Sequence, residues 1–478
     1  MWFPLRRLAF VAALVSGLAL AQTMPPAVSA ALARAKVPGE AVSLLVLQAD
    51  GKGPVRLSHR GEIPMNPASV MKLVTTYAAL DLLGPAYSWR TPVVVEGAVR
   101  EGTLYGNLHI QGRGDPKLVS ERLWLLLRRV RGLGIERISG DIVLDGSAFE
   151  LVDADPGRFD GEALRPYNAT PEALLLNFKS VLMTFVPDPA AHSAAVQFEP
   201  ALAGVQMQKS VPLSNAGCGD YRAALQADFS DATRIRFAGA YPASCGEKVW
   251  PVAYADPASF NRRALAGMWR EVGGTLGGTV REGRVNAPSG VALTPTFELV
   301  SPPLAEIIRD INKHSNNVMA QQLFLTLSLP APDPGDSAAP PASRAASRER
   351  LRRWWQERIS AEDAPLLDNG SGLSRQERIS AQALGRLLQH AYRSPLMPEL
   401  MASLPVVGID GTLRRSQAKA QGSAHLKTGS LRDVLAAAGY VHAASGKRYC
   451  LVAIVNHANA PAARPAIEAL IDWVERDN

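Results

Sequence analysis

Apolar residues at helical spacing occur at both ends of this chain, and short β-rich runs lie between the two blocks. This split is the feature that most constrains the fold. Residues 67–83 carry apolar side chains every three or four positions, which predicts a helix with one buried face. The same spacing returns after residue 300, and the chain closes with strand-like runs and a helix at 462–474. We therefore expect one α/β domain built from both ends of the chain.

The second block supplies most of this domain. Ser301 is expected to cap a helix whose buried face includes Leu304 and Ile311, and residues 330–347 have the composition of a flexible surface loop. The other expected elements are helices at 317–327, 348–359 and 380–392 and strands at 425–428, 436–443 and 448–456.

The length of 478 residues exceeds what one hydrophobic core usually needs, so two or three domains are expected. We assign residues 22–95 plus 291–478 to the domain built from both ends and residues 96–290 to inserted domains. A nested β-rich subdomain is expected at about 190–256. The predicted fold class is therefore α/β (α+β) with inserted mixed α/β and β-rich domains. The elements expected here are strands at 92–95, 104–111 and 138–144 and helices at 121–131 and 260–272.

The first residues have the pattern of a secretory signal. Arg6 and Arg7 precede an apolar run at 8–20 that closes with Ala-Leu-Ala, which predicts a signal peptide at 1–21 and export to the periplasm or cell envelope. A membrane anchor is the alternative, although the run is shorter than the ~20 residues that span a bilayer. The sequence does not decide whether the signal is cleaved.

The charge balance bears on partners. Without residues 1–21 the chain keeps 49 basic and 44 acidic residues, a net charge of +5 spread along its length. A mildly basic exported protein suits anionic surfaces such as cell wall, and association with a membrane surface stays open. The absence of a Lys/Arg cluster argues against a nucleic-acid partner.

Three cysteines occur, at 218, 245 and 450. No C-x-x-C or Cys/His spacing is present, which argues against a structural zinc. Cys218 and Cys245 could pair in an oxidising compartment, but the sequence leaves this undecided. Cys450 lies in the apolar run 449–455 and is expected to be a buried free thiol.

Ser69 and Lys72 are the first candidates for chemistry. Their spacing of three places a hydroxyl and an amine on one face of the predicted helix. Serine is a poor nucleophile without a nearby base, and a desolvated lysine beside other cations can lose its proton near neutral pH. A second S-x-x-K, from Ser416 to Lys419, lies in a polar stretch and is interpreted as a chance match.

Two further motifs follow along the chain. Ser315-Asn316-Asn317 lies at a break between two predicted helices, and Lys427-Thr428-Gly429-Ser430 lies in a late strand, where Gly429 allows a ligand to approach the backbone. Ser259-Phe260-Asn261 repeats the S-x-N spacing but is expected to cap an ordinary helix. The ordered set S-x-x-K, S-x-N and K-T-G is typical of serine β-lactamases and penicillin-binding proteins.

Together with further stretches, these motifs give a family resemblance. The sequence resembles the D-alanyl-D-alanine carboxypeptidase/endopeptidase family, the class C low-molecular-mass penicillin-binding proteins, which carry a long insertion between the first two motifs. The resemblance implies a serine β-lactamase/transpeptidase-like domain with two inserted domains. It rests also on residues 112–116, 165–169, 368–374 and 408–413 and covers nearly the whole mature chain. Two departures are Asn369, inside a D-G-S-G-like turn, and Ser430, where threonine is common.

The resemblance implies cleavage of peptidoglycan stem peptides or cross-links after D-alanine, through an acyl-enzyme that β-lactams would also form. Ser69 would be the nucleophile and Lys72 the base, and no metal or organic cofactor is needed. The remaining implied roles are proton relay by Ser315 beside Lys427, an amide contact by Asn317, an oxyanion donor at the backbone of Ser430, and carboxylate binding by Lys427 and Thr428.

In the family, an aspartate of the insertion contacts the amino-terminated side chain of the stem peptide. Asp145 is the best matching position, although an aspartate before glycine also suits an ordinary turn. Two rival functions are a serine β-lactamase, disfavoured by the long insertion, and a non-catalytic wall-binding scaffold, disfavoured by the intact motifs. The balance of carboxypeptidase and endopeptidase activity, the cross-link chemistry and the oligomeric state stay undetermined.

Overall fold

The computed structural model describes residues 24–150, 155–284, 294–330 and 340–477. The predicted signal peptide at 1–21 lies outside these residues. No helix in the described part of the chain is both long enough and apolar enough to cross a bilayer.

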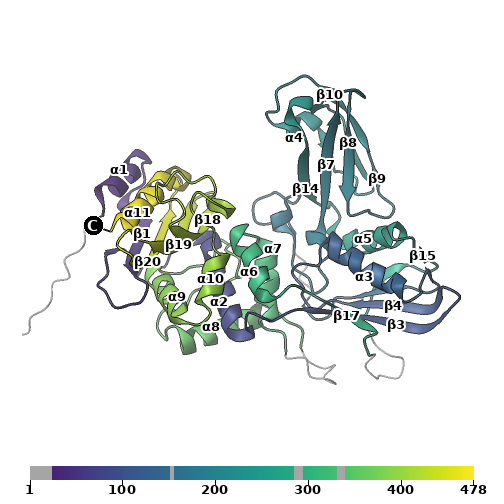
Figure 1. Cartoon of the computed structure of the whole chain (residues 1–478), viewed down its shortest axis with the longest axis horizontal. Coiled ribbons are helices and arrows are strands. Elements are labelled where there is room, and N and C mark those ends of the chain that lie inside the picture. The colour runs from purple at the N-terminus through teal and green to yellow at the C-terminus, as the bar shows by residue number, and fades with distance from the viewer. Residues whose placement is uncertain (1–23, 151–154, 285–293, 331–339, 478) are drawn as a thin grey trace, which may run out of the picture.

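One antiparallel sheet joins the two ends of the chain. β1 pairs with β20 from Val42 opposite Val455 to Gln48 opposite Tyr449, so the first strand completes a sheet formed by the last three. Strands from both ends of the chain therefore share one sheet, and the three predicted carboxyl-terminal strands are present (Figure 1). In sheet order the strands are β18 (Ala424–Leu431), β19 (Val434–His442), β20 (Arg448–Asn456), β1 (Val42–Gln48) and β2 (Leu57–His59).

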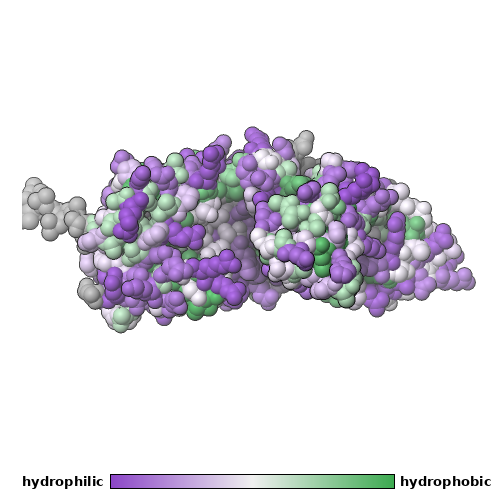
Figure 2. All heavy atoms as spheres, turned by 90° about the horizontal axis from the view of Figure 1, so that it is seen from above, coloured by the Kyte–Doolittle hydropathy of each residue, from purple (hydrophilic) through white to green (hydrophobic). Residues whose placement is uncertain are grey.

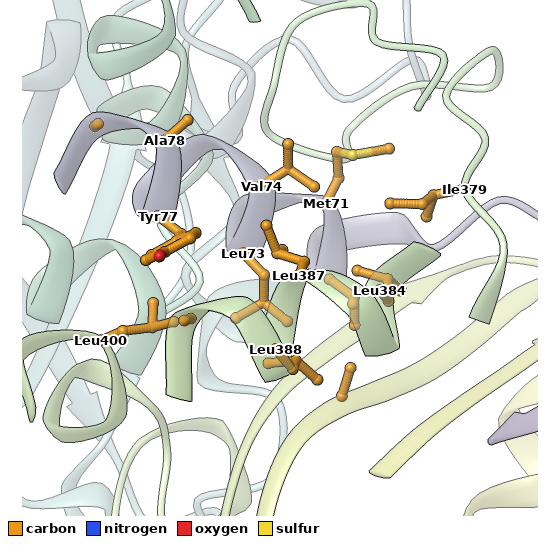
Figure 3. Close-up of a cluster of buried hydrophobic side chains, with 14 of the residues drawn as sticks. Met71, Leu73, Val74, Tyr77, Ala78, Ile379, Leu384, Leu387, Leu388 and Leu400 are labelled. Atoms are coloured by element: carbon orange, nitrogen blue, oxygen red, sulfur yellow. The ribbon is translucent and has the colours of Figure 1, made fainter. Parts of the chain in front are cut away.

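Helices cover both faces of this sheet. One face packs on two helices from opposite ends of the chain, α1 (Pro26–Arg34) and α11 (Arg464–Arg476). The other face packs on a larger helical layer, in which α2 contacts α9 and α10 (Figure 3). This layer comprises α2 (Lys72–Leu83), α6 (Leu304–Lys313), α7 (Asn317–Thr326), α8 (Arg344–Arg358), α9 (Ala381–Arg393) and α10 (Met397–Ser403).

Helix α2 differs from its prediction. All residues from Lys72 to Leu80 are buried, so the helix has no solvent-facing side over this stretch. It lies between α9 and the helices α6, α7 and α8, which is why the expectation of one buried face was wrong. Its first turn, η2 (Ala68–Met71), is a 3₁₀ turn.

The predicted cap at Ser301 was also wrong. Helix α6 begins at Leu304, after Pro303 in an extended conformation. The Ser301 hydroxyl accepts a hydrogen bond from the backbone N–H of Trp89 at 2.9 Å and donates to the Pro302 carbonyl at 2.8 Å. Ser301 therefore ties the chain entering α6 to the chain leaving α2.

The inserted material begins with a seven-stranded mixed sheet whose one face is covered by α3 (Ser120–Gly132) and α5 (Pro257–Glu271) (Figure 1). β3 and β17 pair from Val93 opposite Phe297 to Arg90 opposite Val300, so this sheet extends beyond residues 96–290 at both ends. The strands are β15 (Thr275–Leu276), β5 (Arg137–Ile138), β4 (Thr103–Gln111), β3 (Arg90–Arg100) and β17 (Phe297–Val300), with β6 (Ile142–Asp145) between β4 and β16 (Val280–Glu282).

A second inserted unit is β-rich and projects away from the rest of the molecule in Figure 1. It starts at Ser180, ten residues before the predicted boundary near 190. Its five-stranded sheet contains β13 (Tyr241–Pro242), β10 (Ser210–Ser214), β8 (Ser193–Glu199), β7 (Ser180–Asp188) and β14 (Lys248–Ala253). A smaller sheet of β11 (Ala227–Asp228), β12 (Arg234–Phe237) and β9 (Gln206–Met207) and a short helix, α4 (Tyr221–Leu225), complete it.

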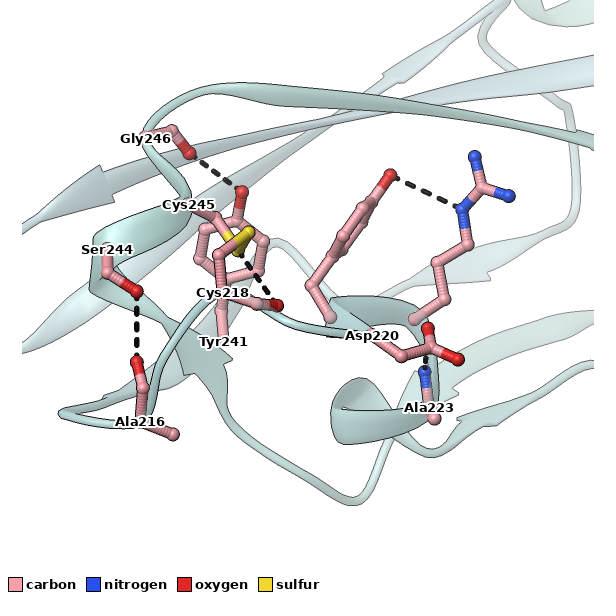
Figure 4. Close-up of a disulfide and its surroundings, with 10 residues drawn as sticks. Ala216, Cys218, Asp220, Ala223, Tyr241, Ser244, Cys245 and Gly246 are labelled. Carbon is pink, nitrogen blue, oxygen red and sulfur yellow. Dashed lines mark hydrogen bonds between the residues drawn. A yellow bond between two sulfur atoms is a disulfide. The ribbon is translucent and has the colours of Figure 1, made fainter.

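Two of the three cysteines form a disulfide and the third is free, which is one of the arrangements that the sequence left open. Cys218 and Cys245 form a disulfide in the β-rich unit, where the Tyr241 hydroxyl donates to the Gly246 carbonyl beside it (Figure 4). Cys450 is a free thiol buried in β20, as predicted.

Candidate active site

Ser69 lies in a strained turn at the start of the buried helix. The preceding residue, Ala68, has a φ of 46°, which is uncommon for a residue other than glycine. Such backbone strain clusters at active sites, because the surrounding structure must enforce it. Here Gly372 leaves room for the turn, since a Cβ at this position would lie 1.9 Å from the Ala68 carbonyl oxygen.

Gly429 supports the same turn from β18. A Cβ on Gly429 would lie 2.5 Å from the Pro67 carbonyl oxygen and 3.0 Å from the backbone nitrogen of Ser69. The absence of a side chain therefore admits the backbone of the Ser69 turn itself. The sequence had suggested close approach of a ligand, whereas the structure shows close approach of the chain's own nucleophile segment.

Lys72 is fully buried and its amine is surrounded by oxygen atoms. Its Nζ lies 2.9 Å from the Ser69 hydroxyl and 2.6 Å from Oδ1 of Asn317, and it also donates to the Ser371 carbonyl. Burial lowers the pKa of Lys72 well below its ordinary value, and the charge of Lys427 lowers it further, whereas Glu377 opposes both effects. Burial and the charge of Lys427 thus favour a neutral amine.

A neutral amine in this setting is oriented toward Ser69. The Ser371 carbonyl and the Asn317 oxygen can only accept hydrogen bonds, so they take the two N–H groups of the amine. The remaining lone pair then faces the Ser69 hydroxyl. This arrangement is the one that a general base for Ser69 requires.

Lys427 and Ser315 form the second pair of the site. Ser315 has a φ of 54° in the break between α6 and α7, and its hydroxyl lies 2.9 Å from Nζ of Lys427. Lys427 is fully buried in β18 and also donates to the Thr428 carbonyl at 2.7 Å. Burial lowers the pKa of Lys427 to about 7.

These residues surround one pocket of about 970 Å³. It opens in the hollow between the domain built from both chain ends and the inserted domains, a hollow that is visible from above in Figure 2. Its wall includes residues of all three predicted motifs, namely Ser69, Ser315, Asn317, Thr428, Gly429 and Ser430. Lys72 contacts Ser69 of this wall, and Lys427 contacts Ser315.

Several residues of the pocket were missed by the sequence analysis. The Thr412 hydroxyl lies 2.6 Å from the Thr428 hydroxyl, and the Arg375 guanidinium stacks over the Phe159 ring at 5.1 Å. Thr412 is in the stretch 408–413 that carried part of the family resemblance, which is the signal that could have identified it. Asp160 lines the same pocket.

Asp145 lies elsewhere. Its side chain is 2% exposed at the end of β6, where it accepts from the backbone N–H of Ser147 at 2.9 Å and from the Gln111 amide at 3.4 Å. It is not among the residues that line the pocket. The structure thus gives Asp145 the turn-forming contact that was its alternative interpretation.

The repeated motif spacings form no comparable constellation. The Ser416 hydroxyl bonds to Glu468 at 3.1 Å rather than to the amine of Lys419. Ser259 was expected to cap its helix, but it lies in the first turn of α5, which begins at Pro257, and donates to the Asp256 carbonyl at 3.4 Å. Within the described residues, no group of three or more His, Cys, Asp or Glu side chains is arranged to hold a metal ion.

Comparison with known proteins gives a match over nearly the whole chain. The family described as D-Ala-D-Ala carboxypeptidase 3 (S13) matches residues 25–477. The D-alanyl-D-alanine carboxypeptidase DacB of Haemophilus influenzae is 23% identical over 83% of this chain and 82% of its own. A D-alanyl-D-alanine carboxypeptidase of Actinomadura sp. is 28% identical over 90% of this chain and 80% of its own.

Solved structures share the fold. Penicillin-binding protein 4 from H. influenzae superposes with a TM-score of 0.71 at 23% identity, covering 94% of this chain and 99% of that one. The same protein has also been solved in complex with a β-lactam. A predatory endopeptidase from Bdellovibrio bacteriovorus superposes with a TM-score of 0.52 at 16% identity, covering 91% of this chain and 94% of that one. The predicted fold class, a transpeptidase-like domain with inserted domains, is confirmed by this likeness.

Proposed function

This chain belongs to the D-Ala-D-Ala carboxypeptidase 3 (S13) family of serine-type hydrolases, and we propose that it cleaves D-alanyl peptides of peptidoglycan through an acyl-enzyme on Ser69. The observation that carries the proposal is the contact of 2.9 Å between Lys72 Nζ and Ser69 Oγ. The base and the nucleophile touch, and the base is held by two acceptors.

Acylation begins when Lys72 takes the hydroxyl proton of Ser69. The Ser69 oxygen then attacks the carbonyl carbon of the D-alanyl residue, and the backbone N–H groups of Ser69 and Ser430 hold the resulting oxyanion. When the C–N bond breaks, the leaving amine needs a proton. Ser315 relays this proton from Lys427, since its hydroxyl contacts the amine of that lysine. Water then attacks the ester carbonyl carbon and its proton passes to Lys427. Lys72 returns the proton of Ser69 when the C–O bond breaks, so both lysines recover their starting states.

The carboxylate of the leaving residue binds at β18. Thr428 and Thr412 both line the pocket, and their hydroxyls are 2.6 Å apart. Because one hydroxyl donates to the other, one hydroxyl proton of the pair stays available for an anion. Lys427, the residue before Thr428, adds positive charge to this part of the site. Asn317 contacts the substrate amide.

Substrate side chains extend toward the insertion. Asp160 is the acidic residue that the insertion contributes to the pocket wall. We assign to Asp160 the contact with an amino-terminated side chain that the sequence analysis had assigned to Asp145. Although burial alone would raise it, hydrogen bonds from the Glu162 N–H, Asn168 and Tyr167 hold the pKa of Asp160 below its usual value. The group is therefore ionised and suits a cationic partner.

The proposal extends to partners and location. β-Lactams acylate Ser69 as covalent inhibitors, because they mimic a D-Ala-D-Ala end. Peptidoglycan as the substrate places the enzyme in the cell envelope, which agrees with the expected signal peptide. Of the rival functions, a β-lactamase is disfavoured by the family match along residues 25–477. A non-catalytic scaffold is disfavoured by the buried, hydrogen-bonded Lys72.

The test is labelling with a fluorescent penicillin, together with release of D-alanine from a pentapeptide. Ser69→Ala should abolish both. Retention of covalent label in this variant would refute the assignment of Ser69, and rapid loss of label from the parent protein would favour a β-lactamase. Digestion of purified sacculi, followed by mass spectrometry, then separates carboxypeptidase products from cleaved cross-links.

A further inference from the structure

Glu377 is a buried carboxylate beside the pocket that none of the three motifs contains. Its side chain is 0% exposed. Oε1 accepts hydrogen bonds from the backbone N–H groups of Asp368, Asn369 and Gly370, at 3.1, 3.1 and 2.9 Å. Successive backbone N–H groups that converge on one oxygen form an anion-binding concavity. The carboxylate therefore fixes the path of residues 368–370.

This loop continues directly to the base. The Gly370 carbonyl accepts from the Thr75 hydroxyl at 2.6 Å, and Oδ1 of Asn369 accepts from the Ser371 N–H at 3.0 Å. The Ser371 carbonyl then accepts from Lys72. Two hydrogen bonds thus link Glu377 to the amine, one from the Gly370 N–H to Glu377 and one from Lys72 to the adjoining Ser371 carbonyl, and Glu377 is not itself part of the pocket wall.

The charges around Lys72 add a second link. Lys427 faces Lys72 from β18, and Glu377 is the carboxylate that opposes this repulsion. Burial raises the pKa of Glu377, and Asp368 acts in the same direction, while the three N–H bonds lower it. Its second oxygen, Oε2, has no hydrogen-bond partner among the described residues. Of the two carboxylate oxygens, only Oε1 is therefore held by hydrogen bonds from the described residues.

We propose that Glu377 is a positioning residue for Lys72, which clamps the loop that presents the Ser371 carbonyl and supplies a negative charge that counters, at Lys72, the repulsion from Lys427. The proposal rests on the proposed function, because it assumes that Lys72 accepts the proton of Ser69. Without Glu377 the amine would lose both a fixed acceptor and part of its basicity.

The test is the pH dependence of the acylation rate with a labelled penicillin. The acidic limb of this profile reports the fraction of Lys72 that is neutral. Because the Glu377 charge raises the pKa of Lys72, its removal in Glu377→Gln lowers that pKa, and the limb moves to lower pH by about one unit. Glu377→Met gives a second neutral variant in case the unpaired amide of glutamine prevents folding.

Two controls separate charge from shape. Glu377→Asp keeps the charge and should leave the limb within a few tenths of a unit of the parent, even if a looser loop slows acylation at all pH values. Asp368→Asn removes a carboxylate from the same loop, but that carboxylate is partly exposed and lies 3.7 Å from Arg348, so the limb should stay in place. Thermal unfolding verifies that each variant is folded.

The inference would be overturned if the acidic limb of the pH profile stayed in place in both Glu377→Gln and Glu377→Met, whatever the loss in acylation rate. An equal shift in Glu377→Asp would assign the effect to loop geometry and would overturn it as well. Lys72→Ala distinguishes the two levels of the argument. If Lys72→Ala acylates at the parental rate, the proposed function itself fails. If Lys72→Ala is inactive but the Glu377 limbs do not move, only the role of Glu377 fails.

Discussion

Lys427 donates to the hydroxyl of Ser315 at 2.9 Å, across 112 residues of sequence. Burial lowers the pKa of Lys427 to about 7, so this lysine loses its charge within the physiological range. Its positive charge is complete only below that value. If Lys427 binds the anionic end of the substrate as proposed, that recognition depends on pH.

We expect kcat/KM for a peptide with a free terminal carboxylate to fall as pH rises through about 7, because Lys427 becomes neutral and no longer attracts the anion. The same peptide with a terminal amide should show a smaller fall, because it loses only the proton relay through Ser315 and not the attraction between Lys427 and the anion. Steady-state kinetics from pH 5.5 to 9 with both peptides checks this. Identical basic limbs for the two peptides would contradict the role of Lys427 in carboxylate binding.

Thr412→Val should raise KM for the carboxylate-terminated peptide with little change in kcat. A hydrogen bond to a charged group contributes about 1.5–3 kcal/mol, which corresponds to roughly 10- to 100-fold. Thr412→Ser keeps the hydroxyl and is the matched control. An equal loss with the amide-terminated peptide would show that Thr412 does not bind the carboxylate.

Asp160→Asn should reduce the preference for peptides whose side chain ends in an amine, because it removes the ionised carboxylate from the pocket wall. Asp145→Asn is the matched control, since that buried carboxylate accepts from Ser147 and Gln111 and does not line the pocket. The measurement is the ratio of kcat/KM for the free-amine peptide and for the same peptide with its amine acetylated. A reduced ratio in Asp145→Asn alone would restore the interpretation that favoured Asp145.

Gly429→Ala should slow acylation by about 10²-fold, because the added Cβ would displace the Ser69 turn and a shift of 1 Å can cost that much. Gly146→Ala is the control, because a Cβ at that position meets nothing within 4 Å. Labelling rates and thermal unfolding temperatures should be measured for both. Parental labelling by Gly429→Ala would argue against close contact between β18 and the Ser69 turn.

Loss of the disulfide should lower the stability of the β-rich unit without preventing acylation of Ser69. A loop closed across 27 residues stabilises by roughly 3 kcal/mol in the chain-entropy description. Cys218→Ser/Cys245→Ser should therefore lower the unfolding temperature while penicillin labelling persists. Loss of labelling at temperatures where the variant remains folded would connect this distant bond to the active site.

The sequence predicted the parts of the site that depend on local spacing. Ser69 and Lys72 are three residues apart, and their contact follows from that spacing on a helical turn. The break between helices at Ser315 was visible because apolar periodicity stops there. The strand of Lys427 was visible in the same way, from β-rich residues bounded by turns.

Contacts that depend on loop conformation could not be predicted from the sequence. The sequence around Glu377 does not predict that its carboxylate accepts hydrogen bonds from three backbone N–H groups. These donors belong to a turn whose path is set by tertiary packing. The same limit applies to Asp145, which the sequence analysis named, and to Asp160, which it did not. Both are plausible turn residues, and only the placement of the insertion decides which one lines the pocket.

The pairing of β1 with β20 has a consequence for the order in which the protein becomes active. Since Val42 lies opposite Val455, the central sheet stays incomplete until β20 has been synthesised. The inserted domains contain their own sheets and can fold earlier during synthesis. A chain interrupted before β20 would therefore contain folded inserted domains beside an incomplete central sheet, so we expect the hydrolase to become active only after β20 has been made.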